Sequence, residues 1–304
     1  MPAVAVGVDA GGSSTVAALS RNGKFVRTAA GAGSSPSVLG VQKAAAVIND
    51  VLERLLCEED PDVICIGAAG AGRSTIARAL STFVRNRFPA SYVEVYDDAQ
   101  MGLRAAGVGT PAIILIAGTG SIALADTATQ TIRAGGLGYL LGDEGSGFAI
   151  GLAAARLLGQ FFDARVPADD FIESIREALE VHSRDELCGR IYGDDLRVGK
   201  IAALAPLALS NASSGSRSAA RIVQSAALEL AELLKTVARK ADLLAAQPSI
   251  VLTGGLLREN SMLSFLLETR VHNDFPGASI LRRPQEPYMG ALETAHTLVA
   301  ERNL

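Results

Sequence analysis

Hydrophobic residues at the start of the chain form short runs separated by glycine-rich or polar turns. Strand-like runs occupy 4–8, 16–19, 24–26, 62–67 and 93–96, and helical periodicity occupies 38–56 and 73–88. Asn22-Gly23 between two of these runs is typical of a tight hairpin. The pattern predicts a β-β-β-α-β-α-β order with a mixed sheet.

The same order begins again in the second part of the chain. Three strand-like runs at 112–116, 121–125 and 131–134 lead into a glycine-rich loop at 135–147. Further on we expect mostly helices through residue 241, with Asp169-Asp170 as the cap of one of them. Within this part we expect a polar loop at 211–218 before a helix at 219–241. After it we expect a strand at 249–252 and a last helix at 288–301, which starts after Pro287. Two β-β-β openings, each with a glycine turn after its first strand, predict a duplicated architecture.

Composition narrows the class of protein. A chain of 304 residues favours two domains, and 49% hydrophobic residues supply material for packed cores. The net charge is -4, aromatic residues are sparse and no Lys/Arg-rich tract is present, which argues against a nucleic-acid partner. No apolar run approaches the ~20 residues of a membrane span, so no membrane partner is expected. Three scattered cysteines fit reduced thiols in a cytoplasmic protein.

Four glycine-rich turns each follow an apolar strand, and together they indicate a bound nucleotide. They contain Gly11-Gly12-Ser13-Ser14-Thr15, Gly118-Thr119-Gly120-Ser121, the loop 135–147 and Gly254-Gly255. Backbone N–H groups in such turns bind anions, and the hydroxyls can add hydrogen bonds to phosphate oxygens. Asp9, directly before the first turn, is a candidate magnesium ligand. Each short turn alone would be an ordinary hairpin, whereas the pair is specific for a triphosphate.

Two acid pairs are candidates for chemistry or recognition. Asp97-Asp98 follows a strand, and we assign Asp98 as the general base and Asp97 as a helix cap. Asp143-Glu144 lies inside the glycine-rich loop, where a carboxylate can accept hydrogen bonds from sugar hydroxyls. Capping of a helix that begins near Ser146 is the alternative for this second pair, and the flanking glycines favour ligand contact for Asp143.

Other catalytic classes find little support. Gly67-Ala68-Ala69-Gly70-Ala71-Gly72-Arg73-Ser74 has the spacing of a P-loop, but Arg73 replaces the lysine that such a loop needs. We interpret it as a close-packed strand–helix turn and keep a P-loop enzyme as an alternative. The three histidines lack metal-binding spacing, and no GxSxG elbow is present.

These motifs, in their order, resemble the N-acetylglucosamine kinase and BadF/BadG-type ATPase family of the actin, hexokinase and Hsp70 superfamily. The segment Gly142-Asp143-Glu144-Gly145-Ser146-Gly147 is the most specific part of a resemblance that covers essentially the whole chain. It implies an α/β fold of two ribonuclease-H-like lobes, with ATP and sugar in the cleft between them. One lobe would comprise 1–111 with the helix 287–304, and the other 112–286.

The resemblance also implies roles for individual residues. Asp98 looks like the base at the sugar 6-hydroxyl, and Asp9 would hold Mg²⁺. The sugar contacts would be Ser35, Asp98, Gly135, Gly136 and Asp143. The ATP contacts would be Gly11, Gly12, Ser13, Ser14, Thr15, Gly118, Thr119, Gly120, Gly254 and Gly255. Ser35 stands where the family often has Asn, and Leu137 where it often has Trp.

The implied activity is phosphorylation of the 6-hydroxyl of N-acetylglucosamine by Mg·ATP, in a cytoplasmic homodimer. A glucosamine kinase is one alternative, and an ATPase that activates a dehydratase is another. Such an activator carries a cysteine-ligated iron–sulfur cluster, and the segment 116–120 contains no cysteine. A sugar-sensing regulator would need a helix-turn-helix, for which the chain shows no extension before its first strand.

Overall fold

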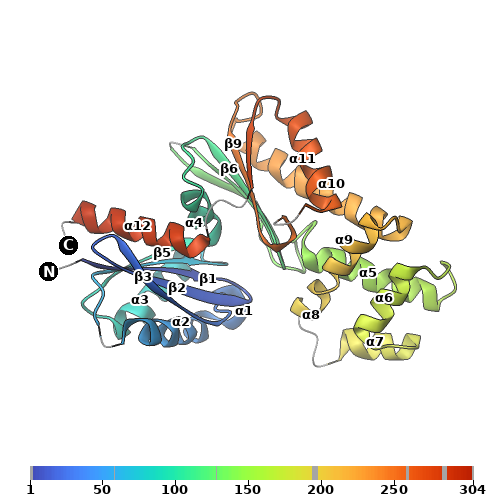
Figure 1. The fold of residues 1–304 in the computed structure, drawn as a ribbon, viewed down its shortest axis with the longest axis horizontal. Helices are drawn as coiled ribbons and strands as arrows, with labels where there is room; N and C mark the ends of the chain where they lie inside the picture. Colours follow the sequence, from blue (N-terminus) through green and yellow to red (C-terminus); the bar gives the residue numbers. More distant parts are fainter. Residues whose placement is uncertain are drawn as a thin grey trace. The chain divides into compact units, whose positions relative to one another are not determined.

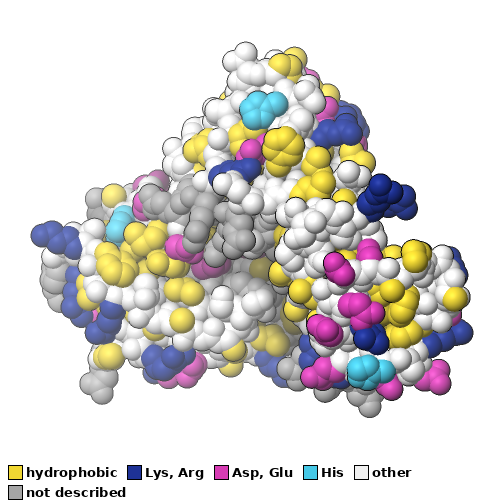
Figure 2. Space-filling model, turned by 45° about the vertical axis from the view of Figure 1, so that its right-hand side comes forward, with side chains coloured by type: hydrophobic (Ala, Val, Ile, Leu, Met, Phe, Trp, Pro, Cys, Tyr) yellow, Lys and Arg dark blue, Asp and Glu magenta, His cyan; other side chains and the backbone are white. Residues whose placement is uncertain are grey.

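The computed structural model describes residues 3–57, 59–127, 129–193, 198–257, 260–282 and 286–302. The chain separates into two compact units, Met1–Gly109 with Arg283–Leu304, and Thr110–Arg282. Each is built on a five-stranded sheet flanked by helices (Figure 1). None of the helices in the described ranges is long and apolar enough to cross a bilayer. Basic and acidic side chains are interspersed on the face drawn in Figure 2.

The first unit joins an antiparallel meander to two parallel strands. Its strands are β1 (Val4–Ala10), β2 (Ser14–Arg21), β3 (Lys24–Ala32), β4 (Val63–Ala68) and β5 (Tyr92–Asp97). Its helices are α1 (Pro36–Leu39), α2 (Val41–Leu56), α3 (Ser74–Arg87), α4 (Asp98–Ala105) and α12 (Pro287–Arg302). The strand order is β3-β2-β1-β4-β5, which leaves β5 at one edge of the sheet.

Helices cover both faces of this first sheet. α2 and α3 pack on one face through a core that includes Ile48, Leu52 and Leu80, while α12 packs on the other face (Figure 1). Gly7 of β1 permits this close approach, because a Cβ atom there would collide with the backbone of Leu292 in α12. The last helix of the chain therefore completes the unit with which the chain begins.

The second unit repeats the strand topology. Its strands are β6 (Ala112–Ala117), β7 (Ser121–Asp126), β8 (Thr131–Gly135), β9 (Ser249–Thr253) and β10 (Ser279–Arg282). Pairs β6–β7 and β7–β8 are antiparallel, and β6–β9 and β9–β10 are parallel, as in the first sheet. The duplicated architecture expected from the sequence is therefore confirmed.

Helices make up most of the second unit. They are α5 (Gly147–Phe162), α6 (Asp170–Leu179), α7 (Arg184–Tyr192), α8 (Val198–Ala202), α9 (Ala205–Ser213), α10 (Arg217–Lys240) and α11 (Met262–Asp274), with a 3-10 turn at Gly255–Leu257. α10 lies against β6, β7 and β8, and α11 packs on α10. The apolar stripe of α10, which includes Leu230 and Leu234, joins a core that extends to Phe171 of α6.

Local expectations are confirmed at several points. Asn22 and Gly23 both have positive φ, as a tight hairpin requires, and α12 begins at Pro287. Asp169 caps α6 by accepting a hydrogen bond from the Ile172 N–H. The segment 67–74 leads from the end of β4 into α3, so the predicted strand–helix turn is confirmed. Its first residue, Gly67, packs closely on α4, because a Cβ atom there would collide with Met101.

Two expectations are wrong. The polar stretch 211–218 is not a loop, because α9 runs to Ser213 and α10 starts at Arg217. Asn211 and Ser213 donate side-chain hydrogen bonds to carbonyls one turn earlier, so polar residues remain helical. The predicted helix 38–56 is divided at Gly40, whose φ of 77° separates α1 from α2.

The contact between β1 and α12 gives a test of the fold. Gly7→Ala should destabilise the protein by about 1–3 kcal/mol, because the added methyl group displaces the α12 backbone. Gly109→Ala is the control, since its Cβ would meet nothing within 4 Å and the change should lie within about 0.5 kcal/mol. Urea unfolding followed by circular dichroism measures both. Equal midpoints for the two variants would contradict the packing described for Gly7.

Candidate active site

In the first unit, three neighbouring strands end at the same edge of the sheet, and two of them, β1 and β5, bring acids there. β1, β4 and β5 are parallel, so their carboxyl ends meet at the same edge. Asp9 of β1 pairs in register with Gly67 of β4, and Ala68 of β4 pairs with Asp97 of β5. Asp98 follows as the first residue of α4. The topology therefore places Asp9 and Asp98 at the same end of one sheet.

Asp97 fixes the start of α4. It is 4% exposed, and its carboxylate accepts a hydrogen bond from the Ala99 N–H at 3.1 Å. The Gln100 side chain accepts in return from the Asp97 N–H at 3.3 Å, which completes a capping box. The predicted role of Asp97 as a helix cap is confirmed, and this cap sets the position of the next residue.

Asp98 is a half-buried carboxyl group with an unusual proton affinity. Burial is the largest cause and raises the pKa of Asp98 to about 7, with help from the charge and hydrogen bond of Asp97 and from the charge of Asp9. A hydrogen bond from the Ala99 N–H, 3.0 Å from Oδ1, acts in the opposite direction. A carboxylate with a pKa near neutrality suits proton transfer from an alcohol.

The first glycine turn exposes Gly12, Ser13 and Ser14 at the same end of β1. The Gly11 N–H closes the turn on the Ser14 carbonyl at 3.0 Å. Thr15 differs, because it is fully buried and its hydroxyl lies 2.6 Å from both the Ala32 carbonyl and the Ser34 hydroxyl. Its side chain therefore holds β2 and the segment after β3 together.

Ser35 is also an internal contact in this structure. It is 3% exposed, and its hydroxyl donates to the Ala69 carbonyl at 2.8 Å and lies 2.8 Å from the Ser37 hydroxyl. These bonds connect the start of α1 to the turn after β4. A sugar contact at Ser35 stays a prediction.

In the second unit, the turn between β6 and β7 rests on the first residues of α5. The N–H groups of Gly147 and Phe148 donate to the carbonyls of Gly118 and Thr119, at 2.8 and 3.1 Å. Ser146 caps this helix by accepting from the Ala149 N–H. The helix cap is thus Ser146, and the alternative that Asp143-Glu144 supplies it is wrong. Thr119 itself is exposed.

Ser121 links this turn to the glycine-rich loop, a role that the sequence analysis missed. Its N–H donates to Asp143 Oδ1 at 3.1 Å, and its hydroxyl donates to the Glu144 carbonyl at 2.7 Å. Its own carbonyl accepts from the Gly136 N–H at 2.9 Å. The only sequence signal was its place at the end of Gly-Thr-Gly-Ser. Ser121 therefore holds both ends of the loop.

Asp143 lies half-buried against this turn. Burial, followed by the charge of Glu144, raises the pKa of Asp143, while the hydrogen bond from the Ser121 N–H lowers it. Gly120 leaves room for this carboxylate, because a Cβ atom there would lie 2.8 Å from Asp143 Oδ1. Asp143 thus keeps one oxygen bound to protein.

The remaining glycines surround the same end of the second sheet. Gly135 and Gly136 both have positive φ at the end of β8. Gly254, with a φ of 101°, follows β9, and a side chain there would collide with Ala117 at the end of β6. The second unit therefore groups Gly118–Gly120, Gly135-Gly136, Asp143 and Gly254-Gly255 around one end of its sheet.

The described part of the chain holds no group of three or more His, Cys, Asp or Glu side chains suited to a metal ion. Cys65 is buried, and burial raises its pKa to about 12, so its thiol is inert. Cys57 and Cys188 are exposed single thiols. A metal with few protein ligands, such as magnesium on ATP phosphates, is the kind that Asp9 suits.

Comparison with known proteins identifies the family. The model of the BadF/BadG/BcrA/BcrD ATPase family matches residues 6–295, and the chain belongs to this family. An N-acetyl-D-glucosamine kinase from Dictyostelium discoideum is 28% identical, over 94% of this chain and 95% of the relative. An N-acetylmuramic acid/N-acetylglucosamine kinase from Clostridium acetobutylicum is 26% identical, over 96% and 98%.

Solved structures show the same fold. A proposed N-acetylglucosamine kinase from Chromobacterium violaceum superimposes with a TM-score of 0.77 at 24% identity, covering 96% of this chain and 98% of that one. The two units, each with a 3-2-1-4-5 strand order, have the actin-like ATPase architecture. The expected α/β fold of ribonuclease-H-like lobes is confirmed.

The raised pKa of Asp98 has a consequence for stability. Between its unfolded pKa near 3.8 and its folded pKa of about 7, the folded state keeps a proton that the unfolded state has lost. Stability from this group is therefore complete below pH 4 and is lost as the pH rises to about 7. Unfolding free energies of wild type and Asp98→Asn across this range should diverge, with wild type losing more. Parallel curves would contradict the environment described for Asp98.

Proposed function

We propose that this protein transfers the γ-phosphoryl group of ATP to the 6-hydroxyl of N-acetylglucosamine. The observation that carries the proposal is Asp98, a half-buried carboxyl group with a pKa of about 7 beside Asp9 at the carboxyl ends of β1, β4 and β5. Two relatives that match almost the whole chain are named as kinases of N-acetylglucosamine. Membership in an ATPase family supports ATP as the phosphoryl donor.

In this reaction Asp98 accepts the proton of the sugar 6-hydroxyl. The hydroxyl oxygen forms a bond to the γ-phosphorus, and the bond between that phosphorus and the β–γ bridging oxygen breaks, which leaves ADP. Such transfers depend mainly on positioning and on stabilisation of negative charge. The cap formed by Asp97 holds Asp98 in place, and backbone N–H groups of the glycine turns supply fixed dipoles for the phosphates.

The nucleotide contacts in the proposal are mainly glycines and hydroxyl residues of the glycine-rich turns. They are Gly11, Gly12, Ser13, Ser14, Thr15, Gly118, Thr119, Gly120, Gly254 and Gly255. Asp9 would hold Mg²⁺, which supplies positive charge at the phosphates when it is bound. Asp9 fits Mg²⁺ by its chemistry, because magnesium prefers oxygen ligands such as carboxylates. One or two carboxylates are enough when phosphate and water complete the coordination.

The sugar contacts in the proposal are Ser35, Asp98, Gly135, Gly136 and Asp143. Asp143 has a second oxygen for a sugar hydroxyl, since one oxygen accepts from Ser121. The same proposal includes a cytoplasmic location, a homodimer and two lobes. One lobe comprises 1–111 with 287–304, and the other comprises 112–286. A glucosamine kinase is the second candidate. A hydroxyl at Ser35 could serve an amine as well as an acetamide, but it would first have to turn away from the Ala69 carbonyl to which it donates here.

Replacement of the proposed base gives the first functional test. Asp98→Asn should lower kcat by about 10²–10⁴-fold and leave ATP binding intact, because only the proton acceptor is lost. For wild type, kcat/KM should fall as the pH drops below about 7, where Asp98 becomes protonated. A coupled ADP-release assay measures both, with the exposed Asp60→Asn as control. Turnover of Asp98→Asn at the control's level would remove Asp98 from the mechanism.

Substrate choice gives the second test. N-acetylglucosamine should exceed glucosamine and glucose in kcat/KM by at least about tenfold, because a site that hydrogen-bonds the acetamido group leaves its own polar groups unpaired with the other sugars. Equal or better values for glucosamine would favour the second candidate. If every sugar fails while slow ATP hydrolysis persists, the kinase proposal is wrong and a dehydratase activator takes its place.

A further inference from the structure

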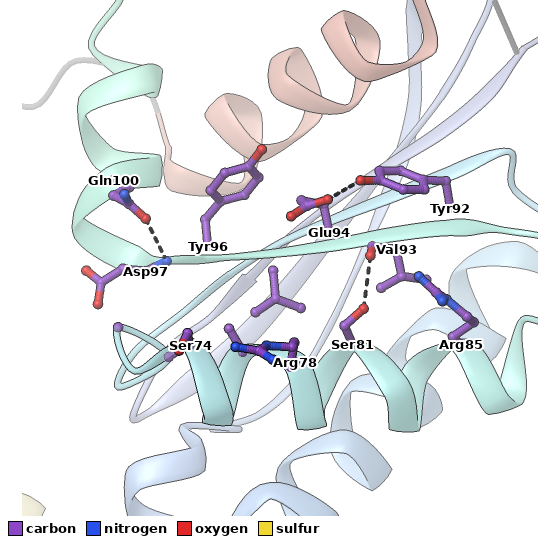
Figure 3. Close-up of a pocket in the computed structure, with 14 residues that line it drawn as sticks. Ser74, Arg78, Ser81, Arg85, Tyr92, Val93, Glu94, Tyr96, Asp97 and Gln100 are labelled. Atoms are coloured by element: carbon purple, nitrogen blue, oxygen red, sulfur yellow. Dashed lines mark hydrogen bonds between the residues drawn. The ribbon is translucent and has the colours of Figure 1, made fainter. Parts of the chain in front are cut away.

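The first unit contains a cavity of about 450 Å³ that the proposed reaction does not use. It follows the free edge of β5, between that strand and α3, and it ends at Asp97 and Gln100 (Figure 3). This volume lies in the range of small-molecule sites, ~300–1,000 Å³. We call this cavity the β5 groove.

One wall of the β5 groove is a polar stripe on α3. Ser74, Arg78, Ser81 and Arg85 all line the cavity, and their spacing of four, three and four residues puts them on one helix face. Arg78 and Arg85 are exposed, and neither makes an ion pair or side-chain hydrogen bond with any residue that the structure describes. The two residues are about 10 Å apart along the helix axis, and the guanidinium groups at the ends of their long side chains are thus available to an anion.

The edge of β5 is itself partly closed to another strand. Ser81 donates a hydrogen bond to the Val93 carbonyl at 3.0 Å, and the Gln100 side chain accepts from the Asp97 N–H (Figure 3). Side-chain bonds of this kind occupy edge groups that a pairing strand would need. The groove is therefore better suited to a small molecule than to an extended chain.

Like charges oppose a second copy of the protein at this edge. Antiparallel pairing of β5 with β5 about a two-fold axis would place the arginines of two α3 helices side by side, and would bring Glu94 of each copy close to the other. Like charges in such positions are destabilising. A partner of opposite charge at the arginines is favoured instead.

The opposite side of the groove suits hydroxyl groups. Tyr92, Glu94 and Tyr96 line it and point to the other side of β5 from α3 (Figure 3). Glu94 accepts a hydrogen bond from the Tyr92 hydroxyl, which leaves further acceptor positions on the carboxylate. Asp97 and Gln100 add polar groups at the end of the groove. Carboxylates and amides of this kind bind hydroxylated ligands.

We propose that the β5 groove binds a hexose phosphate, with its phosphate at Arg78 and Arg85 and its hydroxyls toward Glu94 and Gln100. Guanidinium groups bind phosphate through paired, charge-assisted hydrogen bonds, and no other side chain matches that geometry as well. The ligand belongs to the chemical class of the product, so this part of the inference rests on the proposed function. The groove also contacts Asp97 and Gln100, the two residues of the capping box that precedes Asp98.

Calorimetric titration tests the groove without turnover. Protein saturated with N-acetylglucosamine, which occupies the sugar site, is titrated with N-acetylglucosamine 6-phosphate in the absence of ATP. Wild type should bind one equivalent, and the double variant Arg78→Gln/Arg85→Gln should bind at least about tenfold more weakly. The control Lys43→Gln/Arg221→Gln removes the same charge from exposed residues outside the groove and should bind as wild type does.

Each result decides between the proposals. Equal affinity in the two double variants, with melting curves that show both are folded, would overturn the groove as the site. Inorganic phosphate as the second titrant should bind at least about tenfold more weakly than the sugar phosphate, and equal affinity would overturn the hexose assignment. If wild type phosphorylates the sugar but binds no sugar phosphate under these conditions, only this inference is refuted. Arginine-dependent binding in a protein that phosphorylates no sugar refutes only the proposed function.

Discussion

The candidate site in the first unit depends on one constraint: the surroundings of Asp98 oppose its negative charge. Burial, Asp97 and Asp9 all disfavour ionised Asp98, and only the Ala99 N–H among the identified causes favours it. A flexible chain would separate these carboxylates. They stay together because Asp9 and Asp97 lie on parallel strands of one sheet, and because the capping box fixes the start of α4. The fold thus maintains a carboxyl group that exchanges its proton near neutral pH.

Close packing behind α4 supports this arrangement. Met101 of α4 is 1% exposed and sits where a side chain at Gly67 of β4 would collide with it. On its other side, Gly290 of α12 leaves room for Ala105. The helix that carries Asp98 is therefore held between a strand and the last helix of the chain, and it has little freedom to move away from Asp9. Packing density of this kind makes the position of Asp98 a property of the whole unit.

The second unit uses the same topology for a different purpose. Its sheet repeats the strand order, but the end of the sheet presents backbone groups and one half-buried carboxylate, Asp143. Ser121 organises these groups by three hydrogen bonds to Asp143, Glu144 and Gly136. The duplicated scaffold therefore holds a carboxyl group with a raised pKa in one unit, and backbone groups around a hydrogen-bonded carboxylate in the other, because side chains at equivalent turns differ.

The sequence by itself determined most of the strands, the duplication, the family and the cap at Asp97. Those features depend on periodicity, turn residues and local spacing, which a chain displays without tertiary contacts. It did not determine α11 and β10, because the residues between Gly255 and Pro287 lack a clear period. Only the tertiary structure decided which hydroxyls turn inward, as those of Thr15 and Ser35 do, and how burial beside Asp97 and Asp9 alters Asp98. Side-chain direction and desolvation depend on residues distant in the sequence, and no local pattern encodes them.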